Sequence, residues 1–172
     1  MHEDSARLIA CLPRLRRYAR ALLGDRDRAD DLVQDTVERG WDRLASWRRD
    51  GDMRAWLFGI MHNLHVDQLR RPAVATVALD DEAAPLPPRS EPSTPHRDGL
   101  ELRDMATALQ LLPAEQREVL LLVALEEMSY DEVAATLHIP RGTVMSRLSR
   151  GRERLRLLML GQPVAAALKV VK

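Results

Sequence analysis

A proline-rich segment near the middle of the chain constrains the fold most strongly. Six of the ten prolines in the 172 residues fall between Pro72 and Pro95. The segment RPAVATVALDDEAAPLPPRSEPSTPHRDG has no helical period, and its proline, serine and acidic residues are typical of a semi-extended linker. The sequence therefore predicts folded units at residues 1–71 and 100–160, a linker at 72–99, and a tail at 161–172 to which no role is assigned.

Both units are predicted to be helical, because Leu, Ala, Arg and Glu dominate and strand-like alternation is absent. We expect helices at residues 5–23, 27–46, 53–71, 100–111, 114–126, 130–137 and 141–158. Pro113 suits the first turn of a helix. Ser129 and Glu132 have the spacing of a capping box. The predicted fold class is all-α, with two small helical domains joined by a flexible linker.

Several classes of protein are not favoured. No apolar run reaches the roughly 18 residues of a membrane span, and the N-terminus lacks the apolar core of a signal peptide. The single cysteine, Cys11, fits a reducing cytosol and is expected to be a plain buried residue. No glycine-rich phosphate loop follows a strand, so neither an enzyme nor a cofactor is predicted. His62 and His65 lack a third ligand for a metal ion.

Charge is distributed unevenly along the chain. The 26 basic and 26 acidic residues give a net charge of zero, so bulk charge does not indicate a nucleic-acid binder. Residues 25–42, however, contain seven acidic residues against three arginines, and residues 141–156 contain six arginines against one acidic residue. This asymmetry predicts separate surfaces for separate partners.

Residues 129–156, SYDEVAATLHIPRGTVMSRLSRGRERLR, predict a helix-turn-helix. Apolar residues at helical spacing lie on both sides of a break at Ile139-Pro140. The N-terminal part of the second helix of such a motif contacts base edges, and the candidates for this role are Arg141, Thr143, Met145, Ser146, Ser149 and Arg150. Candidates for phosphate contacts are Arg147, Arg152, Arg154 and Arg156. The alternative is a solvated basic helix, but the capped helix and the turn favour DNA.

The segment ADDLVQDTVERGWDRL predicts an amphipathic helix with an acidic face. One stripe contains Asp31, Asp35, Glu38 and Asp42, and the opposite side contains Val33, Val37, Trp41 and Leu44. The acidic stripe is either an ordinary solvated face or a docking face for a basic helix. A catalytic role is not favoured, because no apolar pocket would raise the pKa of a carboxyl group.

The segment from Trp47 to Arg71 is rich in aromatic residues. Trp56, Asn63, Asp67 and Arg70 share one side of the predicted helix. Aromatic side chains beside Arg and Asn can stack on unpaired bases and read them. The alternative is that the aromatics form the core of a small domain, which is the expected position of Trp41 and Phe58.

Three stretches in this order resemble the bacterial extracytoplasmic-function (ECF) sigma factors: LVQDTVERGWDRL, RAWLFGIMHNLHVDQLRR, and LLPAEQREVLLLVALEEMSYDEVAATLHIPRGTVMSRLSRGRERLR. The resemblance implies a sigma-2-like bundle and a sigma-4-like helix-turn-helix. It also implies a promoter-specificity subunit that binds core RNA polymerase and directs initiation at minus-ten and minus-thirty-five elements. Many relatives are held inactive by an anti-sigma factor.

The resemblance assigns roles to named residues. Candidate contacts with the polymerase clamp are Asp31, Gln34, Asp35 and Glu38. Candidates for the minus-ten element are Trp47, Arg48, Arg49, Trp56, Asn63, Asp67, Arg70 and Arg71, and the loop from Trp47 to Met53 would hold a flipped base. Candidates for the minus-thirty-five element are Arg141, Thr143, Met145, Ser146, Arg147, Ser149 and Arg150. The linker would run toward the RNA exit path.

The sequence departs from the family pattern at three positions. Met145 stands where many relatives carry Lys or Arg, which puts one contact with DNA in doubt. Gly40 and Gly151 stand where Ala is frequent, and each costs up to about 1 kcal/mol of helix stability.

Two other functions stay open: a stand-alone helix-turn-helix regulator, which would usually dimerise on a palindrome, and a sigma-like decoy that binds an anti-sigma protein. The relative placement of the two domains is also left open.

Overall fold

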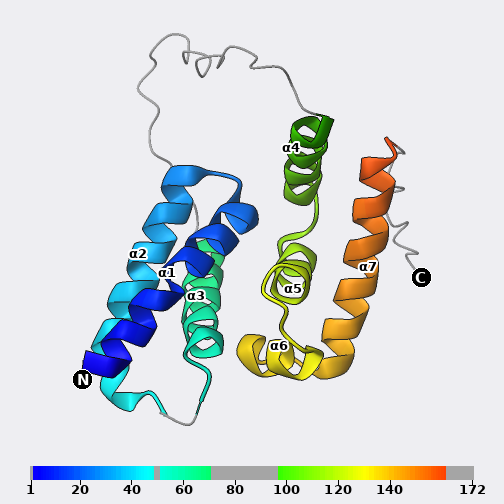
Figure 1. Ribbon diagram of the computed structural model, residues 1–172. Helices are drawn as coiled ribbons and strands as arrows, with labels where there is room; N and C mark the ends of the chain where they lie inside the picture. Colours follow the sequence, from blue (N-terminus) through cyan, green and yellow to red (C-terminus); the bar gives the residue numbers. More distant parts are fainter. Residues whose placement is uncertain (1, 49–50, 71–96, 162–172) are drawn as a thin grey trace, which may run out of the picture.

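The computed structural model describes residues 2–48, 51–70 and 97–161, and these residues form helices and no strands. The first region contains α1 (His2–Leu23), α2 (Arg26–Asp42), the short 3-10 helix η1 (Leu44–Ser46) and α3 (Met53–Arg70). The second region contains α4 (Arg97–Gln110), α5 (Ala114–Ala124), α6 (Tyr130–Leu137) and α7 (Arg141–Met159) (Figure 1). The all-α prediction is confirmed.

Each predicted helix is present, with differences at the ends. The helix predicted at 27–46 ends at Asp42 and is followed by η1. The helix predicted at 114–126 ends at Ala124, and Glu127 then adopts a left-handed backbone conformation with φ 56° that turns the chain toward α6. Pro113 is the N-cap residue of α5 and does not lie in its first turn. Most of the predicted linker and tail lie outside the described residues, but α4 begins at Arg97.

Local capping interactions fix the helix ends that frame the helix-turn-helix. The Ser129 hydroxyl accepts a hydrogen bond from the Glu132 amide at 3.2 Å, and the Glu132 carboxylate accepts one from the Ser129 amide at 2.7 Å. The capping box is therefore confirmed. At the other end of α6, His138 is left-handed with φ 53°, and Pro140 is the N-cap residue of α7. These two residues make the turn tight.

The core of the first region lies between α1, α2 and α3. Leu15, Leu32 and Leu57 are fully buried, and the Tyr18 and Phe58 rings meet edge to face with centroids 4.9 Å apart. Phe58 is therefore a core residue, as predicted.

The core position predicted for Trp41 is wrong, because its side chain is 51% exposed. The buried stripe of α2 runs through Ala29, Leu32 and Thr36 to Gly40, and Trp41 is rotated by about 100° from Gly40. A Cβ atom at Gly40 would lie 2.8 Å from Cδ2 of Leu57. The missing side chain at Gly40 therefore allows α2 and α3 to approach closely, which the sequence did not reveal.

The second region has its core between α5, α6 and α7. Val119, Val133 and Val144 are fully buried, and Leu148 and Leu137 lie close to them. On α7, Val144 and Leu148 face this core, and Leu155 packs partly buried against it.

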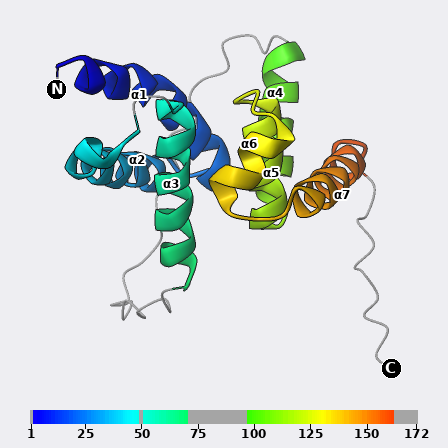
Figure 2. The same ribbon diagram turned by 90° about the horizontal axis from the view of Figure 1, so that it is seen from below.

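The two regions pack against each other, α1 against α4 and α5, and α3 against α6 (Figures 1 and 2). Polar contacts join them: Gln110 Nε2 to the Ala21 carbonyl (2.9 Å), Arg117 Nη1 to the Leu22 carbonyl (2.5 Å), Arg54 Nη1 to the Glu126 carbonyl (2.8 Å), Arg17 Nη2 to Glu126 Oε1 (2.9 Å), and His62 Nδ1 to Glu118 Oε1 (2.7 Å). The sequence left the relative placement of the two domains open, and in this structure they are packed together.

Candidate nucleic-acid interface

The acidic stripe of α2 is exposed along the side of the helix that faces away from the core. The structure brings together all four residues predicted to contact the polymerase: Asp31, Gln34, Asp35 and Glu38. The Gln34 amide donates a hydrogen bond to Glu38 Oε1 at 3.0 Å. The stripe is an accessible row of acceptors that could receive a basic partner.

A groove of about 650 Å³ lies between α1 and α2 beside this stripe. Its apolar lining includes Leu12, Val33 and Val37, and charged side chains stand along both helices. Arg16 and Arg20 of α1 were not identified from the sequence, because their proximity to α2 depends on how the helices pack. The groove combines an apolar floor with charges of both signs, a combination suited to an amphipathic helix.

The loop that begins at Trp47 gives mixed support to the predicted base pocket. Trp47 is buried in the core of the first region, with the Arg7 guanidinium carbon 6.0 Å from the centroid of its ring. Its indole Nε1 has no hydrogen-bond partner among the described residues. This burial places Trp47 in the core that supports the loop, and its predicted contact with the minus-ten element stays a prediction. Arg48 is exposed, and Arg49 lies outside the described residues.

The predicted reading face of α3 is partly covered by the second region. Asn63, Asp67 and Arg70 are exposed, whereas Trp56 is half-buried. Trp56 and Asn63 line a pocket of about 370 Å³ whose other wall is formed by Ala135, Thr136 and His138 at the end of α6. A Cβ atom at Gly59, between them on α3, would lie 3.6 Å from the Thr136 carbonyl oxygen. Arg71 lies outside the described residues.

The reading face of α7 is open to solvent. Arg141, Met145, Ser149 and Arg150 are exposed, and Thr143 and Ser146 are partly exposed. The Arg150 guanidinium folds back along the helix and donates to the Ser146 carbonyl at 3.2 Å and to its hydroxyl at 3.3 Å. Arg141 donates to the Asp131 carboxylate at 3.2 Å. The structure therefore brings the predicted base-reading residues together on one accessible face.

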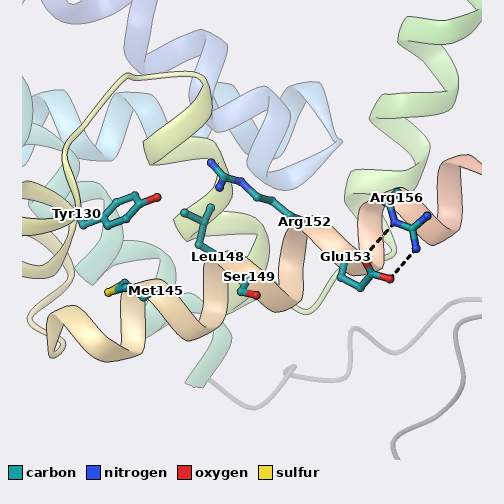
Figure 3. Close-up of a pocket in the computed structure, with 7 residues that line it drawn as sticks. All are labelled: Tyr130, Met145, Leu148, Ser149, Arg152, Glu153 and Arg156. Atoms are coloured by element: carbon teal, nitrogen blue, oxygen red, sulfur yellow. Dashed lines mark hydrogen bonds and ion pairs between the residues drawn. The ribbon is translucent and has the colours of Figure 1, made fainter.

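The remaining arginines of α7 are not equally available. Arg147, predicted as a DNA contact, is partly buried and lies 3.0 Å from the Glu115 carboxylate of α5. Arg156 pairs with Glu153 at 2.8 Å. Figure 3 shows Met145, Ser149 and Glu153 on successive turns, beside a groove of about 370 Å³ that Tyr130 also lines. Tyr130 was not among the predicted site residues, because it belongs to the preceding helix.

Burial changes the chemistry of several side chains. It lowers the pKa of the His65 imidazole and raises the pKa of the half-buried Cys11 thiol, which stays protonated and unreactive at neutral pH. Among the described residues, no three His, Cys, Asp or Glu side chains are placed to hold a metal ion. Within the same residues, no helix has the length and apolar character needed to cross a membrane.

Two family models match the chain in the order of its two regions. The model described as the sigma2 domain of PhyR matches residues 8–62, which runs from within α1 through α2 into α3. The model described as sigma-70, region 4, matches residues 102–155, which extends from α4 into α7. The residues between these two matches contain the proline-rich segment.

Individual relatives agree with the family models. The ECF RNA polymerase sigma factor EcfG of Rhodopseudomonas palustris (strain TIE-1) is 36% identical over 158 residues, covering 91% of this chain and 86% of the relative. The sigma factor RpoE of Bartonella quintana, solved with the anti-sigma factor NepR, is 32% identical with a TM-score of 0.74, covering 93% of this chain and 98% of that chain. CnrH, solved with the cytosolic domain of CnrY, is 28% identical with a TM-score of 0.68, covering 95% and 92% respectively. This chain belongs to the family of ECF RNA polymerase sigma factors.

Proposed function

We propose that this chain gives core RNA polymerase its promoter specificity, with residues 1–71 as the sigma-2-like domain, 100–160 as the sigma-4-like domain and 72–99 as the linker. The observation that carries the proposal is the pair of exposed faces, acidic on α2 and basic on α7, on the two regions that match the family models. The first face suits a protein partner and the second suits DNA. The chain itself carries out no reaction and needs no cofactor in this role, and it acts in the cytoplasm.

The polymerase contact is assigned to Asp31, Gln34, Asp35 and Glu38. Their exposure supports this role, and the groove beside them offers apolar surface to a docked helix. Charge complementarity with a basic helix of the polymerase clamp would steer association and fix the register of the contact. Apolar burial in the groove would supply much of the affinity.

The minus-ten role is assigned to the exposed face of α3, with Asn63 and Asp67 as base readers and Arg70 as a backbone contact. Trp56 borders the same face. The end of α6 stands against Gly59 and forms one wall of the pocket that Trp56 and Asn63 line. Asp67 and Arg70 are exposed in the packed arrangement, but a DNA strand cannot occupy the space that α6 fills, so a contact with Trp56 requires α3 and α6 to separate.

The minus-thirty-five role is assigned to α7. Residues near its N-terminus would enter the major groove, where Arg150 is suited to hydrogen bonds with a guanine edge. Arg141 and Arg152 are exposed and suited to phosphates, whereas the pairing of Arg147 with Glu115 makes it a weaker candidate.

An anti-sigma factor is proposed as the regulator of this chain. Two of the similar structures support this proposal. RpoE was solved with the anti-sigma factor NepR, and CnrH was solved with the cytosolic domain of CnrY. A regulator that held the two regions in their packed arrangement would keep the α3 face covered by α6.

Run-off transcription with core RNA polymerase on a genomic promoter library tests the proposed function. Start sites that share two upstream elements and appear only with this protein would support it. Asp35→Arg should reduce both polymerase binding and initiation, because it puts a positive charge in the acidic stripe. Asp104→Arg, at an exposed position on α4, is the matched control and should leave both unchanged. Tight polymerase binding without initiation would instead indicate a decoy. If the protein neither binds polymerase nor supports initiation, it would be a stand-alone regulator.

A further inference from the structure

Met145 is a large apolar side chain in the middle of the polar reading face of α7. It is 51% exposed, whereas its helix neighbours Val144 and Leu148 are 0% and 3% exposed. The core between α5, α6 and α7 is therefore filled without Met145. Exposed apolar residues are common on protein surfaces, so the exposure of Met145 alone does not indicate a function. Its position on α7 does.

That position is the fifth of α7, within the first two turns, where a helix-turn-helix contacts base edges. Ser149 lies one turn further along the same stripe, and Arg150 follows it (Figure 3 shows Met145 and Ser149). Met145 thus stands among side chains that can form hydrogen bonds, at a site that base edges would reach.

The chemistry of the side chain restricts what it can recognise. A thioether has no donor and is only a weak acceptor, so Met145 can neither pair with a phosphate nor read a base through a strong hydrogen bond. The thymine methyl group is the apolar group that base pairs present in the major groove. An unbranched, polarizable side chain adapts well to such a contact.

The neighbouring polar groups leave this contact to Met145. The Ser146 hydroxyl donates to the Thr143 carbonyl at 3.1 Å and accepts from Arg150 at 3.3 Å, so much of its hydrogen-bonding capacity is used within the helix. The groove of about 370 Å³ beside Met145 includes Tyr130 and Leu148 in its lining. A methyl group directed at Met145 would therefore meet a partly apolar surface.

We infer that Met145 determines specificity in the upstream promoter element by contacting the C5-methyl group of a thymine on either strand. The inference rests on the proposed function, because it requires α7 to lie in the major groove of promoter DNA. It assigns to this position an apolar contact in place of the charged contact that a Lys or Arg would make.

The test uses the full chain with core RNA polymerase on a promoter that run-off transcription has identified. Each thymine of the upstream element is replaced in turn by deoxyuridine, which removes only the methyl group. At one position we expect initiation at limiting holoenzyme to fall about fourfold, since a buried methylene contributes about 0.8 kcal/mol. With Met145→Ala, thymine and deoxyuridine should support equal initiation at that position.

Two controls separate this contact from a general effect. Met159→Ala alters another exposed methionine, in the last turn of α7, and should keep the full sensitivity to deoxyuridine. Cytosine and 5-methylcytosine are then compared at the same position. The methyl group should raise initiation by the wild-type protein and leave initiation by Met145→Ala unchanged.

Two results would overturn the inference while leaving the proposed function in place. The first is initiation that is insensitive to deoxyuridine at every thymine. The second is a sensitivity that Met145→Ala retains in full. If the protein supports no initiation from any promoter, the proposed function fails and the inference fails with it.

Discussion

The two candidate DNA-reading helices differ in how much of their reading face is accessible. On α7, Met145, Ser149 and Arg150 are exposed to solvent. On α3, Trp56 and Asn63 line a pocket that α6 of the other region closes on one side. Under the proposed function, the upstream element can be contacted in the packed arrangement, whereas a contact of the minus-ten element with Trp56 requires the regions to separate.

The chemistry of the contact between the regions fits such a separation. Hydrogen bonds and ion pairs made by Arg17, Arg54, Gln110 and Arg117 cross it. Apolar packing contributes too, because the buried apolar residues of both regions belong to one cluster. Interfaces between domains of one chain resemble transient protein–protein interfaces, so relative motion of the two regions is the default expectation. The comparison therefore predicts that variants on α7 change DNA binding directly, and variants at the contact change access to α3.

Arg150→Ala should have the largest effect on DNA. If the guanidinium reads a guanine edge, its loss costs about 1–3 kcal/mol of binding to the upstream element and relaxes sequence preference at one position. The measurement is holoenzyme affinity for promoters with single substitutions in that element. Arg156→Ala is the matched control: Arg156 pairs with Glu153 and is a candidate phosphate contact only, so its loss should leave sequence preference unchanged. An equal loss on all sequences would make Arg150 a phosphate contact.

Glu126→Gln should weaken the contact between the regions. Glu126 is 0% exposed, and its carboxylate lies 2.9 Å from Arg17 and 3.8 Å from Arg14. We expect a loss of about 2 kcal/mol, less than the roughly 3–5 kcal/mol of a wholly buried pair, because both guanidinium groups are about half exposed.

The distance between spin labels on α2 and α7 reports this separation. The label pair should show a larger population of long distances in Glu126→Gln than in the wild-type protein. Glu153→Gln, which removes an exposed carboxylate from α7, should leave the distribution unchanged. An unchanged distribution in Glu126→Gln, with the fold intact, would contradict the view that this pair holds the regions together.

Local sequence patterns were sufficient to predict the helices, the capping box and the two charged faces. The acidic stripe of α2 follows from helical periodicity and the reading face of α7 from its place in the helix-turn-helix, and both are exposed in the structure. Helical periodicity did not predict the exposure of Trp41, the burial of Trp47 or the ion pair of Arg147. Trp41 is exposed because Gly40 occupies the close approach to α3, and Arg147 pairs with Glu115 on another helix. Such contacts depend on tertiary packing, which periodicity within one helix does not encode.

The contact between the regions could not be predicted from the sequence either, because it also depends on tertiary packing. Glu126 meets Arg17, which lies 109 positions earlier, and the proline-rich segment between them permits many placements. No local pattern distinguishes Glu126 from its exposed neighbour Glu127. Only the packed arrangement shows which of the two acids is buried.

Ser129→Ala should have a smaller effect, through α6. Loss of the capping hydrogen bond costs about 1 kcal/mol of stability. Hydrogen bonding by the Ser129 backbone amide, and next by its side chain, lowers the pKa of the Glu132 carboxyl, so the contribution of the Glu132 carboxylate to stability is present at neutral pH and is lost as pH falls through the folded-state pKa. Because α6 both covers α3 and supports α7, the variant should lower the unfolding free energy without altering sequence preference. Urea denaturation and promoter selection measure the two effects, and a changed preference would contradict this account.

The smallest expected effect is the pH dependence that His65 contributes. Burial within α3 lowers the pKa of its imidazole below the ordinary value, so the unfolded chain binds a proton at a higher pH than the folded chain does. The contribution of His65 to stability is therefore present above the unfolded-state pKa and is lost as pH falls toward the folded-state value. Between pH 7.5 and 5.5, His65→Leu should reduce the fall in unfolding free energy that urea denaturation measures. His138→Asn, at an exposed left-handed position that Asn tolerates, should leave that fall unchanged. An identical pH profile in His65→Leu would show that other groups govern the acid response.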